Sequence, residues 1–291
     1  GRIYFGKEGN NVPRLKLYLC EIEQGVTPHT LWLANEVGTN DIAKKNLVSL
    51  FDSIACFDTP KPISLINRLL QISNNKEAII LDFFSGSATT AHAVMQLNSE
   101  DGGNRKFIMV QLPEKTDEKS EAFKAGYKNI CEIGKERIRR AGKKIKEESP
   151  LTTQDLDTGF RVLKLDSTNM QDIYYSPKDI SQADLFSQVD NVKPDRTGED
   201  LLFQVMLELG ATLDSKIETT TVAGKTIYNV AEGYLVACFD PDVTDEVVKA
   251  IAQMLPAYAV LRDTSMKDDS TATNFEQIFK TYSPDTVTKI L

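Results

Sequence analysis

The sequence predicts an α/β protein in which a parallel βαβ unit comes first and a smaller C-terminal α/β domain follows. A continuous apolar run at residues 78–84 predicts a buried parallel strand, because strands covered on both faces lack polar alternation. A loop of small residues, a helical pattern over 88–97 and a second apolar run at 106–111 come next. Crossovers of this kind are right-handed in nearly all proteins, so we expect the two strands in one sheet.

Apolar residues at helical spacing predict further helices in the first domain. They cover 41–51, a segment from Ile63 to Leu70 with Pro62 near its first turn, and 128–146. Residues 13–23 are predicted to form a short helix. In the longest helix we expect one face to be buried and the basic residues to point outward. The inward residues are Ile130, Ile133, Ile138, Ala141 and Ile145, and the outward ones are Lys135, Arg139, Arg140, Lys143 and Lys144.

The sequence changes character after Pro150. Alternation over 159–165 predicts a strand, and the polar, Asp-rich residues 167–197 predict a loosely structured connection. The smaller domain then shows helical patterns at 199–213, 245–255 and 273–282, and strands around 220, 227, 236, 258–261 and 286–290. The predicted division is 1–150, 151–197 and 198–291.

Composition limits the functions that this surface can have. A net charge of −8 argues against a nucleic-acid groove over the whole surface, because phosphate contacts need concentrated Lys and Arg. Four scattered cysteines without a CxxC pair, and only two histidines, argue against a zinc site. Reduced thiols in a cytoplasmic protein are the simplest explanation. No apolar run is long enough to cross a bilayer and no leader opens the chain, so we expect neither export nor a membrane partner.

The loop Ser85-Gly86-Ser87 joins the first apolar strand to a helix. The first amide groups of a helix are free, and the helix dipole favours negative or polar ligand groups there. Small residues let a ligand approach the backbone closely. An ordinary tight turn is the alternative, because the segment lacks both the G-x-G-x-x-G pattern of dinucleotide sites and the Lys of a phosphate-binding P-loop.

The wider pattern resembles a known family. Residues 57–62, FDTPKP, and 82–87, D-x-F-x-GS, are similar to the tenth and first motifs of β-class amino-methyltransferases. Residues 1–7, 30–32, 101–114 and 132–140 resemble the modification subunits of type III restriction–modification systems, which methylate adenine at N6 in DNA. The resemblance is dense to about residue 166 and looser beyond it.

In that family the two motifs together hold S-adenosylmethionine, so the resemblance implies part of a Rossmann-like methyltransferase sheet. The implied cofactor-binding residues are Lys61, Pro62, Asp82, Phe83, Phe84, Ser85, Gly86, Ser87, Thr89, Gln111 and Leu112. Ala88 replaces the last glycine of the family's F-x-G-x-G pattern, and it can sit close to a ligand only if its φ stays negative. Gln111 replaces an acidic residue that grips the ribose, and its amide can accept one hydroxyl hydrogen bond.

The family's chemistry needs an Asp-Pro-Pro-Tyr type motif that stacks a flipped adenine and orients its amine. No such motif occurs, and Phe239-Asp240-Pro241-Asp242 is better interpreted as a turn before a helix. We therefore expect a chain that lacks the catalytic motif and the target-recognition region and is inactive alone. The resemblance implies DNA, the restriction subunit and a second modification subunit, in a homodimer, as partners. The alternatives are a non-catalytic assembly module and a nicotinamide-dependent oxidoreductase.

Overall fold

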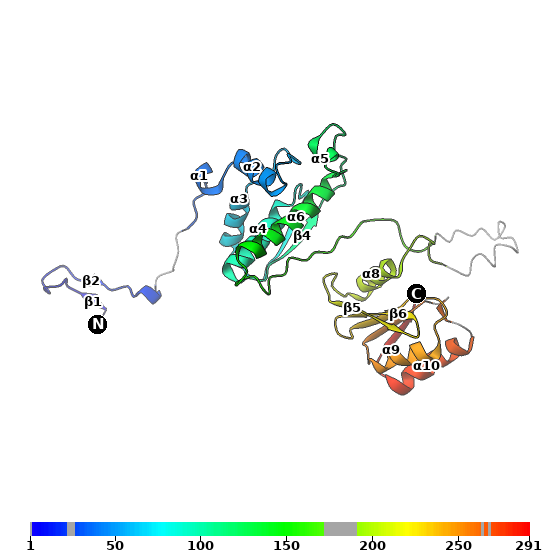
Figure 1. Ribbon diagram of the computed structural model, residues 1–291. Helices are drawn as coiled ribbons and strands as arrows, with labels where there is room; N and C mark the ends of the chain where they lie inside the picture. Colours follow the sequence, from blue (N-terminus) through cyan, green and yellow to red (C-terminus); the bar gives the residue numbers. More distant parts are fainter. Residues whose placement is uncertain (1, 22–26, 172–190, 263–264, 267–268) are drawn as a thin grey trace, which may run out of the picture. The chain divides into compact units, whose positions relative to one another are not determined.

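The computed structural model describes residues 2–21, 27–171, 191–262, 265–266 and 269–291 (Figure 1). The chain forms two compact units, residues 1–160 and 161–291. Both are built from helices and sheets, so the α/β class predicted from the sequence is confirmed. None of the helices in the described ranges is long and apolar enough to cross a bilayer.

Unit 1 begins with short elements. Strands β1 (Ile3–Tyr4) and β2 (Arg14–Leu15) form an antiparallel pair, and a 3-10 turn, η1 (Leu19–Glu21), follows. The helix predicted for residues 13–23 is therefore wrong where the structure describes it, since backbone groups there pair with β1 instead. Helices α1 (Ala34–Val37) and α2 (Asn40–Leu50) come next, and α2 confirms the predicted amphipathic helix.

A βαβ unit forms the centre of unit 1. The βαβ unit consists of β3 (Ile79–Phe83), α4 (Thr89–Asp101) and β4 (Lys106–Val110). Helix α3 (Ile63–Ser73) precedes it, and α5 (Glu121–Lys124) and α6 (Ile130–Glu148) follow it. Strands β3 and β4 are parallel neighbours, with Ile79 opposite Lys106 and Phe83 opposite Val110. Helix α4 packs against α3, α6 and β4. The two parallel strands and the helix between them are as the sequence predicted.

The β3–β4 sheet is covered on one face only. Ile80 and Phe107 pack against a buried cluster from α3 and α4. The alternate side chains are exposed: Ile79, Leu81, Phe83, Ile108 and Val110. The prediction of a strand buried on both faces is thus wrong for the described residues, because helices pack on only one side of this two-stranded sheet. Parallel sheets are normally covered on both faces.

The strand predicted at residues 159–165 does not form. These residues have no ladder partner, and Leu165 is fully exposed. Alternation alone cannot make a strand when no neighbouring strand pairs with its backbone groups. Most of the predicted connection, residues 172–190, lies outside the described residues.

Unit 2 is a five-stranded sheet between two helical layers. Its elements are α8 (Gly198–Leu209), β5 (Ile217–Val222), β6 (Lys225–Val230), β7 (Leu235–Cys238), α9 (Asp245–Gln253), β8 (Tyr258–Leu261), α10 (Asp269–Tyr282) and β9 (Val287–Ile290). The strand order is β5-β6-β7-β8-β9, antiparallel through β7 and parallel beyond it.

Each helix and strand predicted for residues 199–290 has a counterpart in unit 2, although α8 ends four residues earlier and α10 begins four residues earlier than predicted. One buried cluster joins the sheet to α9 and α10, and a second joins it to α8. A two-residue hairpin turn joins β5 to β6, with Ala223 at φ 48° and Gly224 at φ 76°. Positive φ at both central residues is the turn that matches the twist of paired strands.

Acid is expected to destabilise the chain through His92 on α4. Burial, with Arg137 and Lys144 nearby, lowers the pKa of His92 to about 3. The unfolded chain protonates this side chain below its usual pKa of about 6.5, whereas the folded chain does not until about pH 3. Folding stability therefore falls as pH drops through this window, by at most about 1.4 kcal/mol per pH unit for one group.

The measurement is the midpoint of thermal unfolding between about pH 7 and about pH 5. His92→Asn should flatten the pH dependence, whereas the matched change His29→Asn, at an exposed residue, should leave it unchanged. Equal slopes for all three proteins would contradict the assignment to His92.

Candidate functional site

The loop between β3 and α4 has an unusual backbone. Phe84, Gly86 and Ala88 adopt positive φ angles of 57°, 53° and 59°. The condition under which the sequence analysis allowed Ala88 to sit close to a ligand, a negative φ, is therefore not met, and Ala88 is not among the residues that line the cavity described below. Its methyl group is buried against α6 instead of facing outward, which explains how alanine is accommodated here. Only glycine adopts this region without a steric cost.

Hydrogen bonds from the neighbouring strand hold the first part of the loop. Ser85 N–H donates to the carbonyl of Val110 at 3.1 Å, and Gly86 N–H donates to Oε1 of Gln111 at 2.7 Å. The amide oxygen that the resemblance assigned to a ribose hydroxyl thus accepts from the loop. The acid of the motif, Asp82, accepts a hydrogen bond from Thr90 Oγ1 at 2.5 Å.

Helix α6 supports the loop from the opposite side. Gly134 has no side chain at the point where α6 meets the loop, and a methyl group there would lie 3.4 Å from the carbonyl oxygen of Gly86. Arg137 Nη1 donates to Ser87 Oγ at 2.8 Å and to Thr89 Oγ1 at 2.7 Å. The sequence analysis missed Arg137. Its signal was a charged residue four positions from both Ile133 and Ala141, within the apolar stripe of the helix.

The loop and the Lys61 segment face one cavity. A methyl group at Gly86 would come within 3.2 Å of Cζ of Phe57, which precedes Lys61 in the same segment. The cavity has a volume of about 420 Å³, within the range of small-molecule sites. Besides the two segments, apolar side chains of α3 and β3 form its wall: Ile66, Leu69, Leu70, Ile80 and Leu81.

Most of the residues expected to bind cofactor line this cavity. They are Lys61, Asp82, Phe84, Ser85, Gly86, Ser87 and Thr89. The lining does not include Pro62, which caps α3, the exposed Phe83, or Gln111 and Leu112. The lining also includes Phe57, Thr59 and Pro60 of the 57–62 motif, together with Thr90, none of which was among the implied cofactor-binding residues. Cofactor binding by any of these side chains stays a prediction.

Two buried titratable groups of unit 1, which do not line this cavity, do not suit proton transfer near neutral pH. Burial raises the pKa of the Cys56 thiol to about 11. His92 stays neutral because burial and neighbouring cations lower its pKa to about 3. The arrangement can therefore seat a ligand between backbone amides and apolar side chains, with polar groups at the loop, but Cys56 and His92 supply it no acid, base or nucleophile.

The chain is similar to known proteins over most of its length. Residues 8–143 match the model of a family described as DNA methylase. The StyLTI Mod subunit of a type III restriction–modification enzyme, from Salmonella typhimurium, is 41% identical over 160 residues, covering 55% of this chain and 24% of the relative. The EcoP15I Mod subunit, from Escherichia coli, is 33% identical over 258 residues, covering 87% and 36%.

A third relative extends the match. The EcoPI Mod subunit, from Escherichia phage P1, is 33% identical over 235 residues, covering 78% of this chain and 34% of the relative. This chain thus spans between 24% and 36% of the lengths of these three proteins. The chain is thus similar to the DNA methylases over residues 8–143, and to the modification subunits of type III restriction–modification systems over up to 258 residues.

Proposed function

We propose that the chain supplies the S-adenosylmethionine-binding portion of a site-specific adenine-N6 DNA methyltransferase, with part of its Rossmann-like sheet. The observation that carries the proposal is the cavity shared by the Gly86 loop and the Lys61 segment. Its apolar wall suits an adenosine group, and the polar loop suits the amino-acid end. Gly86 has no side chain, so a ligand can approach its backbone closely. The space there is narrow, because an added methyl group would already crowd Phe57.

When bound, S-adenosylmethionine would supply the methyl group that is transferred. The chain's own residues would bind and orient it, and orientation contributes strongly to transfer reactions of this kind. The Asp-Pro-Pro-Tyr type motif that binds the adenine would come from polypeptide outside these 291 residues. That polypeptide would also cover the apolar face of the β3–β4 sheet. The exposed side chains on that face and the share of the relatives spanned here support this proposal. We expect no methyl transfer by the 291-residue chain alone.

The proposal extends to the partners of a modification subunit in the cytoplasm. We expect DNA, the restriction subunit and a second modification subunit as partners, because the relatives are Mod subunits of type III restriction–modification enzymes and the sequence resembles that family. Because the net charge is −8, we expect most contacts to DNA phosphates to come from polypeptide outside these 291 residues. A purely scaffolding role for this chain is the alternative outcome of the binding test below.

Calorimetric titration of the chain with S-adenosylmethionine is expected to give saturable binding, tighter than binding of NAD. Gly86→Ala should weaken it, because the new methyl group would strain a backbone at φ +53° and approach Phe57 to 3.2 Å. The matched control is Gly224→Ala, which meets the same backbone strain at φ +76° in unit 2 but has open space around it.

Both substitutions should lower the unfolding midpoint, and only Gly86→Ala should change the dissociation constant. A chain that gives neither binding heat nor a thermal shift with S-adenosylmethionine would favour the scaffolding alternative.

Gln111→Ala tests whether this side chain holds the loop or the ligand. In the structure its Oε1 accepts a hydrogen bond from the Gly86 amide, so Gln111→Ala should speed hydrogen exchange of that amide in the ligand-free chain. A role in ligand binding alone predicts unchanged exchange in the ligand-free chain and a higher dissociation constant for S-adenosylmethionine. The exchange rate of the Gly86 amide in the unsubstituted chain and in Gln111→Ala decides between the two roles.

A further inference from the structure

Arg137 is a buried cation without an acidic partner. Its residue is 2% exposed, and among the described residues no carboxylate forms an ion pair with it. Burial lowers the pKa of its guanidinium to about 10. It also lies beside the first residue of α4, where the helix dipole is unfavourable for a positive charge. A buried, unpaired charge costs folding stability, so stability alone does not explain this residue.

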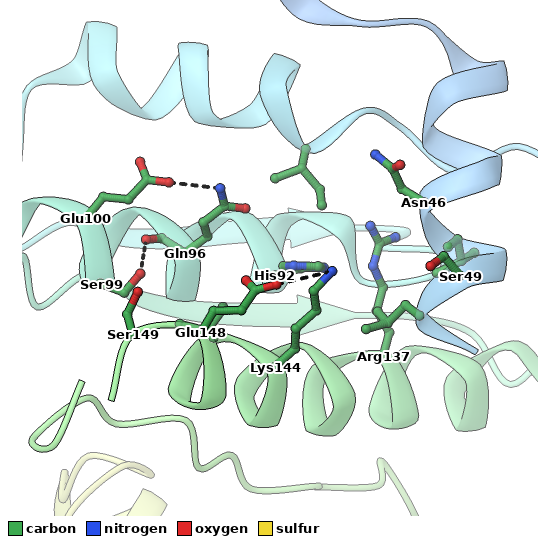
Figure 2. A pocket seen from close by; sticks show the side chains of 14 residues that line it. Asn46, Ser49, His92, Gln96, Ser99, Glu100, Arg137, Lys144, Glu148 and Ser149 are labelled. Atoms are coloured by element: carbon green, nitrogen blue, oxygen red, sulfur yellow. Dashed lines mark hydrogen bonds and ion pairs between the residues drawn. The ribbon is translucent and has the colours of Figure 1, made fainter. Parts of the chain in front are cut away.

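The guanidinium separates two cavities. On one side it lines a second cavity of about 380 Å³, which Figure 2 shows with His92, Lys144 and Asn46 also in its wall. Nε of Arg137 and Nδ1 of His92 are buried without hydrogen-bond partners. Lys144 forms an exposed ion pair with Glu148, with Nζ and Oε1 3.7 Å apart. Among the described residues, no carboxylate on this side forms an ion pair with the guanidinium.

All the hydrogen bonds found for Arg137 run to the other side, to the loop of the proposed cofactor site. Nη1 contacts the hydroxyl oxygens of Ser87 and Thr89 and, at 3.5 Å, the carbonyl oxygen of Ser87. Ser87 and Thr89 flank Ala88, whose positive φ is sterically costly, and both line the proposed cofactor cavity. One cation thus ties together the two ends of the strained residue.

We propose that Arg137 is a positioning residue that holds the Ser87–Thr89 turn in its ligand-ready conformation from behind the cofactor cavity. The proposal rests on the proposed function, because the ligand is S-adenosylmethionine. Arg137 does not touch that cavity itself. Its effect on affinity passes through the two hydroxyl groups and the backbone between them.

The test is Arg137→Met, which removes the charge and the donors and keeps an unbranched apolar side chain in the buried site. The unfolding midpoint should be unchanged or higher, since replacing an unpaired buried charge by an apolar side chain is often neutral or stabilising. The dissociation constant for S-adenosylmethionine should rise about tenfold or more, the order seen when the supporting contacts of a binding site are lost. Arg137→Lys keeps the charge without the planar donor geometry and should show a smaller rise.

Arg139→Met is the matched control, because it is the same substitution on an exposed residue of the same helix. Hydrogen exchange in the ligand-free chain provides a readout that does not depend on the cofactor. The amides of Gly86 and Ala88 should exchange about tenfold faster in Arg137→Met and at the original rate in Arg139→Met.

The outcomes separate the two proposals. If the unsubstituted chain binds S-adenosylmethionine and Arg137→Met binds it equally well, the positioning role is wrong and the proposed function stands. A lower unfolding midpoint with unchanged affinity and loop exchange would likewise show a purely structural role. Faster loop exchange in Arg137→Met together with no binding by the unsubstituted chain would support the positioning of the loop and overturn the ligand.

Discussion

The backbone of residues 84–88 is the constraint on which the candidate site depends. Three residues of this loop have left-handed φ angles, and two of them, Phe84 and Ala88, are not glycine. Each such residue costs roughly 1–2 kcal/mol, so the loop does not hold this shape by local preference. Contacts from β4 and α6, which lie more than twenty residues further along the chain, supply what the local sequence does not.

This dependence explains the pattern of residues on α6. A helix that merely covered a sheet would place apolar side chains along its inner face, as Ile133 and Ala141 do. Two inner positions depart from that rule, Gly134 and Arg137, and both meet the loop. A glycine and an unpaired buried cation both lower the stability of α6, but both residues fix the geometry of the loop. A loss of stability in return for a defined binding site is common in proteins that bind a ligand.

Sequence patterns predicted the elements well where apolar periodicity was long. The βαβ unit, α6 and the helices and strands between residues 198 and 290 follow from spacing that local chemistry enforces. The patterns failed where pairing decides the outcome: residues 159–165 alternate but have no partner strand, and residues 14–15 pair with β1 instead of forming a helix. The positive φ of Ala88 and the hydrogen bond from Gly86 to Gln111 could not be predicted from the sequence either, because both depend on side chains that come together only on folding.

The two units differ in how completely they bury their sheets. In unit 2 the central strand β7 is buried along its whole length, between α8 on one face and α9 and α10 on the other. In unit 1 alternate side chains of β3 and β4 remain exposed, Ile79 at 67% and Phe83 at 65%. An exposed apolar face of this kind is unfavourable in water, so the β3–β4 sheet of unit 1 needs a partner surface. The sheet of unit 2 needs none, because helices cover both of its faces. The bare face belongs to the same two strands that carry Asp82 and Gln111. Whatever covers that face therefore packs on the sheet that positions the loop, which gives a direct physical route by which further chain could complete the proposed site.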